Sequence, residues 1–270
     1  MLLRVLGQHV GEMWSQPLVL DNRPGASGII ATELAAKAPP DGYTLYLGTD
    51  GPLTINPSLH ASLPYDWRRD FAPITLSAVA GQVPVVSSSV PARNVQDLIA
   101  LARQQLGCIN YASTGVGGSP HLGAEQFKVH AGVDLAHIPY EGGPQTITAL
   151  LTDEAQVLFT TESSAAPHVK SGKMRMLATT SKKRSAGFPD VPTVAEQGLP
   201  DFEMNVWFAL FAPAGTPVPV LMKLNADFVR LLDKKDVREA LQARDLEAPV
   251  QFARRASRLC PEGPGPTGPR

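Results

Sequence analysis

Residues 113–121, STGVGGSPH, combine three glycines with three hydroxyl side chains, a proline and a histidine. A strand-like run at 109–112 precedes them and a helix-like run at 122–129 follows. A glycine-rich loop between a strand and a helix exposes backbone N–H groups at the positive end of the helix dipole, where an anion is favoured. The stretch therefore predicts an anion cradle, to which Ser113 and Ser119 could add hydroxyl donors. A plain β–α turn explains the same pattern.

The spacing within this loop argues against nucleotides and against hydrolysis. No Gly-Lys-Ser/Thr follows the glycines, and Pro120 interrupts the G-x-G-x-x-G pattern, so a carboxylate is a better candidate ligand than a phosphate. A serine hydrolase would need G-x-S-x-G, but the sequence around Ser119 reads GGSPH. A hydrolase using Ser119 and His121 therefore stays an unfavoured alternative.

Three further loops carry similar residue types after strand-like runs. Tyr140 precedes Glu141, Gly142 and Gly143, so an aromatic wall would stand beside free backbone amides. Asp50 and Glu162 also follow strand-like runs and could meet an ammonium or hydroxyl group of a ligand. A helix N-cap for Asp50 and a solvated carboxylate for Glu162 are the alternatives. The loops at 48–51, 113–119, 140–144 and 160–164 together predict a cleft built from several loops.

Composition excludes several classes of protein. The 270 residues, 43% of them hydrophobic, suffice for a full core, and the net charge of −1 argues against binding nucleic acid or an anionic membrane surface. The two cysteines form no metal spacing, and the six histidines form no H-x-x-x-H pair, so we expect no metal site and no cofactor. No apolar run reaches the length of a membrane span, and the first residues do not resemble a signal peptide.

Strand-like and helix-like segments alternate along the chain. Apolar spacing predicts helices at 2–13, 29–38, 122–129, 145–151 and 165–171, after the capping pattern of Asn94 and Asp97, and after Pro217. Strands are predicted at 18–20, 43–47, 71–79, 83–87, 109–112, 135–139, 157–160, 174–179 and 207–211. Such alternation is typical of parallel α/β layers, in which ligands bind at the carboxyl ends of strands.

Several ordered motifs resemble the Bug family, the periplasmic solute receptors of tripartite tricarboxylate transporters. They are VLDNRPGA at 19–26, PDGYTL at 40–45, INPSL at 55–59, LPYD at 63–66, DFAP at 70–73, NYAS at 110–113, HIPY at 137–140, FPDVPT at 188–193 and FAPAGTP at 211–217. The resemblance covers about residues 1–246. It implies the two-lobe type II periplasmic-binding-protein fold, with lobe one at 1–90 plus 205–250 and lobe two at 91–204. Residues 251–270, rich in Pro and Gly toward their end, are predicted from their composition to be a disordered tail.

The same resemblance implies a function. The chain would be a periplasmic solute-binding receptor and not an enzyme, a monomer that delivers a dicarboxylate, tricarboxylate or amino acid to integral-membrane transporter subunits. The resemblance implies these ligand-binding residues at the cleft: Thr49, Asp50, Ser113, Thr114, Gly115, Gly117, Ser119, His121, Tyr140, Gly142, Gly143 and Glu162.

The sequence departs from the family pattern at both ends. The family pattern has a signal peptide, a strand and a Pro/Gly-rich loop before the first helix, so we expect lobe one to lack its N-terminal strand and the loop facing residues 113–119. That strand would be a neighbour of 18–20 and 43–47, which would lose its backbone hydrogen bonds. Beyond residue 250 the sequence reads as a changed reading frame. A truncated or frame-shifted fragment without binding activity is therefore the second alternative.

Overall fold

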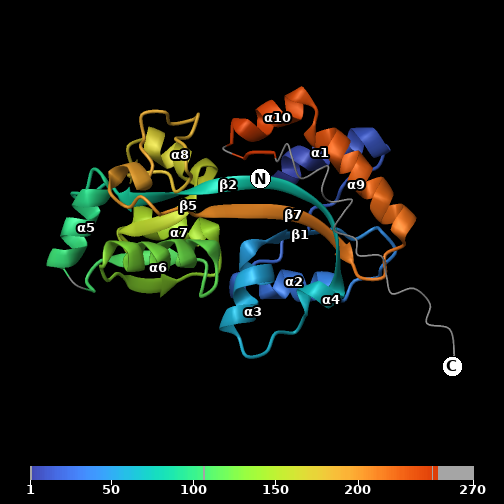
Figure 1. Cartoon of the computed structure of the whole chain (residues 1–270), viewed down its shortest axis with the longest axis horizontal. Coiled ribbons are helices and arrows are strands. Elements are labelled where there is room, and N and C mark those ends of the chain that lie inside the picture. Colours follow the sequence, from blue (N-terminus) through green and yellow to red (C-terminus); the bar gives the residue numbers. More distant parts are fainter. Residues whose placement is uncertain (1, 106, 245, 249–270) are drawn as a thin grey trace.

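Two long strands cross the molecule and connect its two lobes (Figure 1). In this computed structural model, which describes residues 2–105, 107–244 and 246–248, strand β2 spans Phe71–Ser87 and strand β7 spans Asn205–Pro213. β2 pairs antiparallel with β7 along its first part, then with β5 (Val157–Thr161) and β6 (Met174–Met176) along its last part. The prediction of two separate strands at 71–79 and 83–87 is wrong, because the backbone stays extended while β2 changes partners at Gln82.

Lobe one, as the elements define it, consists of β1 (Tyr46–Thr49), β7 and the first part of β2 with their helices. On one side of these strands lie α1 (Leu2–Trp14), α9 (Val218–Leu232) and α10 (Lys235–Gln242), and on the other lie α2 (Ile29–Ala36), α3 (Asn56–Leu59) and α4 (Trp67–Asp70) (Figure 1). Leu2, Leu6 and Val10 recur every four residues, so one face of α1 is apolar and is buried against Phe228 and Leu231 of α9.

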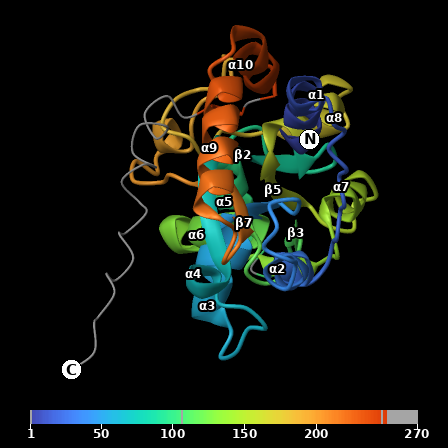
Figure 2. The ribbon, with the colours of Figure 1, turned by 90° about the vertical axis from the view of Figure 1, so that its right-hand side faces the viewer.

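Lobe two consists of β3 (Asn110–Ser113), β4 (Ala136–Pro139), β5, β6 and the end of β2. Helices α5 (Val95–Gln104) and α6 (Ser119–Ala131) cover one face, and α7 (Gly143–Leu151) and α8 (Glu162–Lys170) cover the other (Figures 1 and 2). Val157 and Phe159 of β5 point to the first face and Leu158 to the second, as the two-residue period of a strand requires. Both faces of β5 are therefore buried.

The sheet is mixed, with the strand order β1-β7-β2-β5-β3-β4 and β6 paired to β2. The expectation of parallel layers is correct only for β3 with β4 and β5, since the pairs that involve β2 and β7 are antiparallel. Residues 18–20 form no strand, and β1 begins at Tyr46, three residues later than predicted. Among the described residues β1 pairs with β7 alone. The predicted tail lies outside the described residues, and the lobe boundaries 1–90, 91–204 and 205–250 stay a prediction.

The hydroxyl of Thr180 joins the two connections between the lobes. It accepts a hydrogen bond from the backbone N–H of Gln82 at 2.7 Å and lies 2.5 Å from the backbone oxygen of Met204. The Met204 N–H in turn donates to the Thr180 carbonyl at 3.1 Å. Since Thr180 is fully buried, these bonds fix the point at which the chain passes from one lobe to the other.

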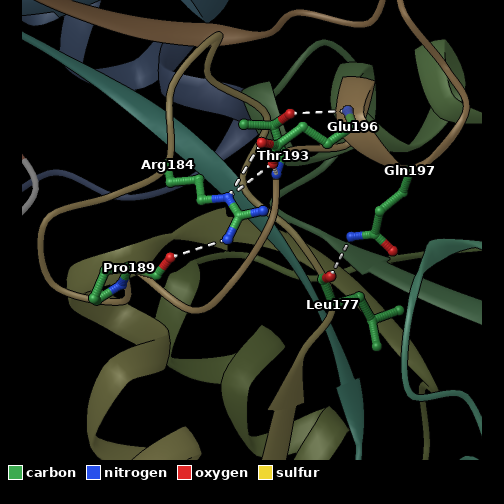
Figure 3. Close-up of polar contacts among 6 residues, drawn as sticks. All are labelled: Leu177, Arg184, Pro189, Thr193, Glu196 and Gln197. Atoms are coloured by element: carbon green, nitrogen blue, oxygen red, sulfur yellow. Dashed lines mark hydrogen bonds and ion pairs between the residues drawn. The ribbon is translucent and has the colours of Figure 1, made fainter.

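The loop after this crossing is held by side chains (Figure 3) and by one backbone bridge between Thr179 and Thr193. The Thr193 N–H donates to the Glu196 carboxylate at 2.7 Å and the Glu196 N–H donates to the Thr193 hydroxyl at 3.0 Å, which is a capping box at the short helix Ala195–Gln197. Arg184 also donates to Glu196, at 3.0 Å, and Gln197 donates to the Leu177 carbonyl at 2.8 Å. The loop therefore has a defined position against lobe two.

Candidate functional site

A hydrogen bond between the lobes joins two of the predicted site residues. Asp50 follows β1 and precedes the π-helical turn Gly51–Ile55, while Ser119 begins α6 in the other lobe. The Ser119 hydroxyl donates to the Asp50 carboxylate at 2.7 Å. Asp50 is only 7% exposed, and this burial raises the pKa of its carboxyl against the opposing effect of the Ser119 hydrogen bond. Asp50 occupies the N-cap position of the turn Gly51–Ile55, as the alternative expected, but its side chain makes no capping hydrogen bond there.

The glycine loop packs directly against lobe one beside this pair. The Ser27 hydroxyl lies 2.8 Å from the Val116 carbonyl oxygen and 3.2 Å from that of Thr114. A Cβ atom at Gly115 would lie 2.8 Å from the Ser27 hydroxyl oxygen, and one at Gly51 would lie 3.2 Å from the Gly117 carbonyl oxygen. These approaches are too close for a larger side chain, which is why glycine occupies both sides of the contact. We call this contact the interlobe seam.

A cavity of about 880 Å³ lies beside the seam, between the two lobes. Its lining includes three of the predicted residues, Thr114, Gly115 and Tyr140. The remaining lining residues are Ala26, Ser27, Ile29, His60, Val116, Pro139, Glu141, Pro144, Gln145, Thr148, Ala149 and Glu154. Its volume is large enough for a small organic ligand, and its walls come from both lobes, as expected for a site that closes on its ligand.

Helix α7 forms one wall of the cavity. The helix begins at Gly143 after Gly142 and has no capping side chain. Pro144 has no N–H, and the N–H groups of Gln145 and Thr146 donate to the Gly142 carbonyl, so the N–H groups left for a ligand at this end are those of Gly142 and Gly143. The two glycines are therefore placed at the end of the helix that would hold an anion. By contrast, the start of α6 already has the Asp50 carboxylate beside it.

Tyr140 and Glu154 lie together in the wall of the cavity. The Tyr140 hydroxyl oxygen is buried and makes no hydrogen bond of standard geometry with the described residues. Burial, followed by the nearby Glu154 carboxylate, raises the pKa of the Tyr140 phenol. None of the described residues that line the cavity is lysine or arginine. A ligand anion would therefore depend on backbone amides, hydroxyl groups and water.

His121 and Ser113 belong to a cluster behind the glycine loop. The Ser113 hydroxyl lies 2.6 Å from Nε2 of His137, and the His137 ring stacks on Tyr111 at a centroid distance of 4.8 Å. The His121 ring lies 4.7 Å from the His137 ring, and its Nδ1 atom is buried without a partner in the described structure. Burial lowers the pKa of both histidines. Because the Ser119 hydroxyl faces Asp50 and not His121, the two do not form the nucleophile–base pair of a hydrolase.

The remaining predicted residues are not among those that line the cavity. Thr49 ends β1, and Gly117 meets Gly51 at the interlobe seam. Glu162 begins α8 and is only 6% exposed, so the expectation of a solvated carboxylate is wrong. It packs against Gly187, and burial raises the pKa of its carboxyl.

Sequence reasoning missed Ser27, His137 and Glu154. Ser27 and His137 lie in or beside the motifs 19–26 and 137–140, so those motifs carried a signal for them. Glu154 lies in a polar run after α7 that carried none. The described part of the chain holds no group of three or more His, Cys, Asp or Glu side chains placed to bind a metal ion. It also holds no helix long and apolar enough to cross a bilayer.

Comparison with known proteins gives consistent matches over nearly the whole chain. The family described as tripartite tricarboxylate transporter family receptor matches residues 2–263. Protein BugT of Bordetella pertussis is 35% identical over 246 residues, which is 90% of this chain and 74% of BugT. An R. palustris protein solved with adipate is 32% identical, has a TM-score of 0.90, and is matched over 96% of this chain and 88% of that one. MatC from Rhodopseudomonas palustris, solved with bound malate, is 27% identical with a TM-score of 0.86, over 95% and 90% of the two chains.

Proposed function

Because this chain belongs to the tripartite tricarboxylate transporter receptor family, we propose that it holds a small carboxylate in the interlobe cavity and delivers it to the membrane subunits of such a transporter. The proposal includes a periplasmic location. The observation that carries it is the cavity itself, which has walls from both lobes and the uncapped start of α7 on one side.

In this binding mode the carboxylate lies at the loop before α7, where the N–H groups of Gly142 and Gly143 have no acceptor among the described residues. Backbone N–H groups at a helix start carry partial positive charge and bind carboxylates without a cationic side chain. Thr114 and Gly115 also line the cavity from lobe two, and Ser27 lines it from lobe one. A ligand that touches Ser27 and α7 together would stabilise the closed arrangement of the lobes more than the open one.

A binding screen tests this proposal. Thermal unfolding of the purified chain is followed with monocarboxylates, dicarboxylates, tricarboxylates and amino acids, and each hit is titrated by calorimetry. We expect at least one carboxylate to raise the unfolding midpoint in a concentration-dependent way, as binding to the native state alone requires. Absence of any shift, together with a broad unfolding transition, would favour the fragment without binding activity.

A variant assigns the binding to the cavity. Tyr140→Ala removes a ring from the cavity wall, while Tyr43→Ala removes a ring that is 93% exposed on lobe one. We expect the first change to weaken binding at least tenfold and the second to leave it unchanged. Equal affinities for the two variants would place the ligand elsewhere.

A further inference from the structure

Two histidine rings lie behind the glycine loop, while the cavity in front of that loop has no fixed cation among its described lining residues. The carboxylate of the proposed function, on which this inference rests, therefore meets no lysine or arginine there. His121 lies in the first turn of α6 and His137 lies on β4, and their ring centroids are 4.7 Å apart. A proton taken up by this pair would supply the positive charge that the described wall lacks.

Ser113 connects His137 to the wall of the cavity. Its hydroxyl group, which is fully buried, lies 2.6 Å from Nε2 of His137 and accepts a hydrogen bond from the Gly115 N–H at 3.0 Å. Since Gly115 lines the cavity, two hydrogen bonds separate the imidazole from the cavity wall. A neutral imidazole protonated at Nδ1 accepts the hydroxyl proton at Nε2, whereas an imidazolium donates there and the hydroxyl turns to the Gly115 carbonyl, 3.2 Å away. Both protonation states of His137 therefore leave Ser113 fully hydrogen-bonded.

The groups that face the two rings favour one proton on the pair and not two. Tyr111 stacks on His137 at 4.8 Å and donates its hydroxyl to the Glu125 carboxylate at 2.6 Å. Lys128 forms ion pairs with Glu125 and with Asp134. Glu125 therefore attracts a proton to the rings, whereas Lys128 and the second imidazole repel it. Because two imidazolium rings at this separation repel each other, the first proton opposes the second.

Protonation of the pair and binding of a carboxylate should reinforce each other. Burial keeps the pKa of both imidazoles below the ordinary value for histidine, so the pair is mostly neutral at neutral pH when no ligand is bound. A carboxylate in contact with Gly115 lies within about one Debye length, roughly 10 Å, of the His137 ring and favours its charged form. By linkage, a proton on the pair strengthens carboxylate binding by the same factor.

We propose that carboxylate binding to this receptor is coupled to the uptake of a proton from solvent by the His121–His137 pair. His137 places the charge behind Gly115 through Ser113, and His121 shares the proton. The receptor then binds its ligand more tightly as pH falls through the range in which histidine titrates, and it returns the proton to solvent when the ligand leaves.

Other titratable groups near the cavity set the competing assignments. His60 lines the cavity from lobe one, and the carboxylates of Glu141 and Glu154 line it from lobe two. Asp50 accepts the hydrogen bond from Ser119 at the start of α6. A proton taken up with the ligand has to be assigned among these groups and the histidine pair by substitution.

Calorimetry in buffers of different ionisation enthalpy measures the number of protons taken up per ligand. The probes are adipate and malate, the ligands solved with two structural relatives, and any carboxylate found in the screen. We expect a fraction of a proton to be taken up, and the affinity to be about fivefold higher at about pH 6 than at about pH 8. Histidine ring signals followed by NMR over the same range should give a higher pKa for one of the two rings when ligand is bound.

Substitutions assign the proton. The double variant His121→Gln with His137→Gln keeps polar side chains at both positions and should abolish the proton uptake and flatten the pH dependence. His130→Gln, at an exposed position on α6, should change neither, and His60→Gln should leave the proton uptake in place. Binding without proton uptake, an uptake that survives the double variant or one that disappears in His60→Gln would overturn this proposal while leaving a carboxylate receptor in place. Failure of every ligand in the screen would overturn both proposals.

Discussion

Replacing Ser119 with alanine removes the only described hydrogen-bond donor from a side chain to the buried Asp50 carboxylate. The bond is 2.7 Å long and its acceptor is 7% exposed, so it belongs to the class of hydrogen bonds to charged groups. Such bonds contribute about 2 kcal/mol. We therefore expect Ser119→Ala to lower the free energy of unfolding by about 2 kcal/mol at neutral pH, which corresponds to a midpoint about 4–8 °C lower for a chain of this size.

The loss should depend on pH with a defined sign. Burial raises the pKa of Asp50 above its ordinary value, so this group's contribution to stability is complete below that ordinary pKa and is lost as pH rises through the raised one. The hydrogen bond from Ser119 lowers the pKa of Asp50, so Ser119→Ala should raise that pKa further. The variant should therefore lose more stability than the unmodified protein as pH rises. Once the carboxyl is protonated, the missing bond is one between neutral groups, and the deficit should fall to about 1 kcal/mol.

Urea unfolding followed by circular dichroism, at neutral pH and near the acid end of the stable range, measures both values. The control is Ser163→Ala, since Ser163 also lies in the first turn of a helix but its hydroxyl faces only that of Thr161, at 3.3 Å, among described partners. Equal losses for the two variants, or a Ser119→Ala deficit that does not shrink in acid, would refute this interpretation of the interlobe hydrogen bond.

Three further changes probe the crossing, the seam and the buried glutamate. Thr180→Val should lower the free energy of unfolding in urea by about 2–3 kcal/mol, because it leaves the buried Gln82 N–H and Met204 carbonyl without the hydroxyl. Thr180→Ser should recover most of this loss, and equal losses for the two variants would contradict the role of the hydroxyl. Gly117→Ala should lower the thermal midpoint more than Gly132→Ala, since both have positive φ but only at Gly117 would a Cβ meet another side chain. Glu162→Gln should raise the midpoint at neutral pH but not in acid, because burial raises the pKa of Glu162 and its ionised form opposes folding; a lower midpoint at neutral pH would argue against this.

Local signals in the sequence were sufficient for most helices. The four-residue recurrence of apolar side chains predicted α1, and the Asn94–Asp97 pattern predicted the start of α5, where the Asp97 N–H donates to the Asn94 side chain at 2.8 Å. These features depend on residues within one or two turns of each other. The apolar face of a helix can therefore be predicted from sequence alone, and its start where a capping pattern marks it. Without such a pattern, the predicted starts at 122 and 165 were three residues later than the starts of α6 at Ser119 and α8 at Glu162.

Features that depend on distant partners could not be predicted in the same way. Residues 18–20 have strand-like composition, but a strand needs a neighbour, and none pairs with them in the described structure. The Asp50–Ser119 hydrogen bond joins positions 69 residues apart in different lobes. Glu154 lies in no sequence motif, and it is identified as a cavity residue only because the structure places it in the lining after α7. The Bug family resemblance located the loops, whereas the contacts between them came from the three-dimensional arrangement.

Hydrogen exchange with and without a saturating carboxylate, chosen from the screen, tests most directly whether ligand binds between the lobes. We expect slower exchange in the peptides that cover 25–29, 113–119 and 140–149, because these segments form the seam and the cavity wall. Peptides from α10, on the far side of lobe one, should exchange at the same rate in both samples. Protection confined to α10, or absent from the three cavity segments, would contradict binding of the carboxylate in the interlobe cavity.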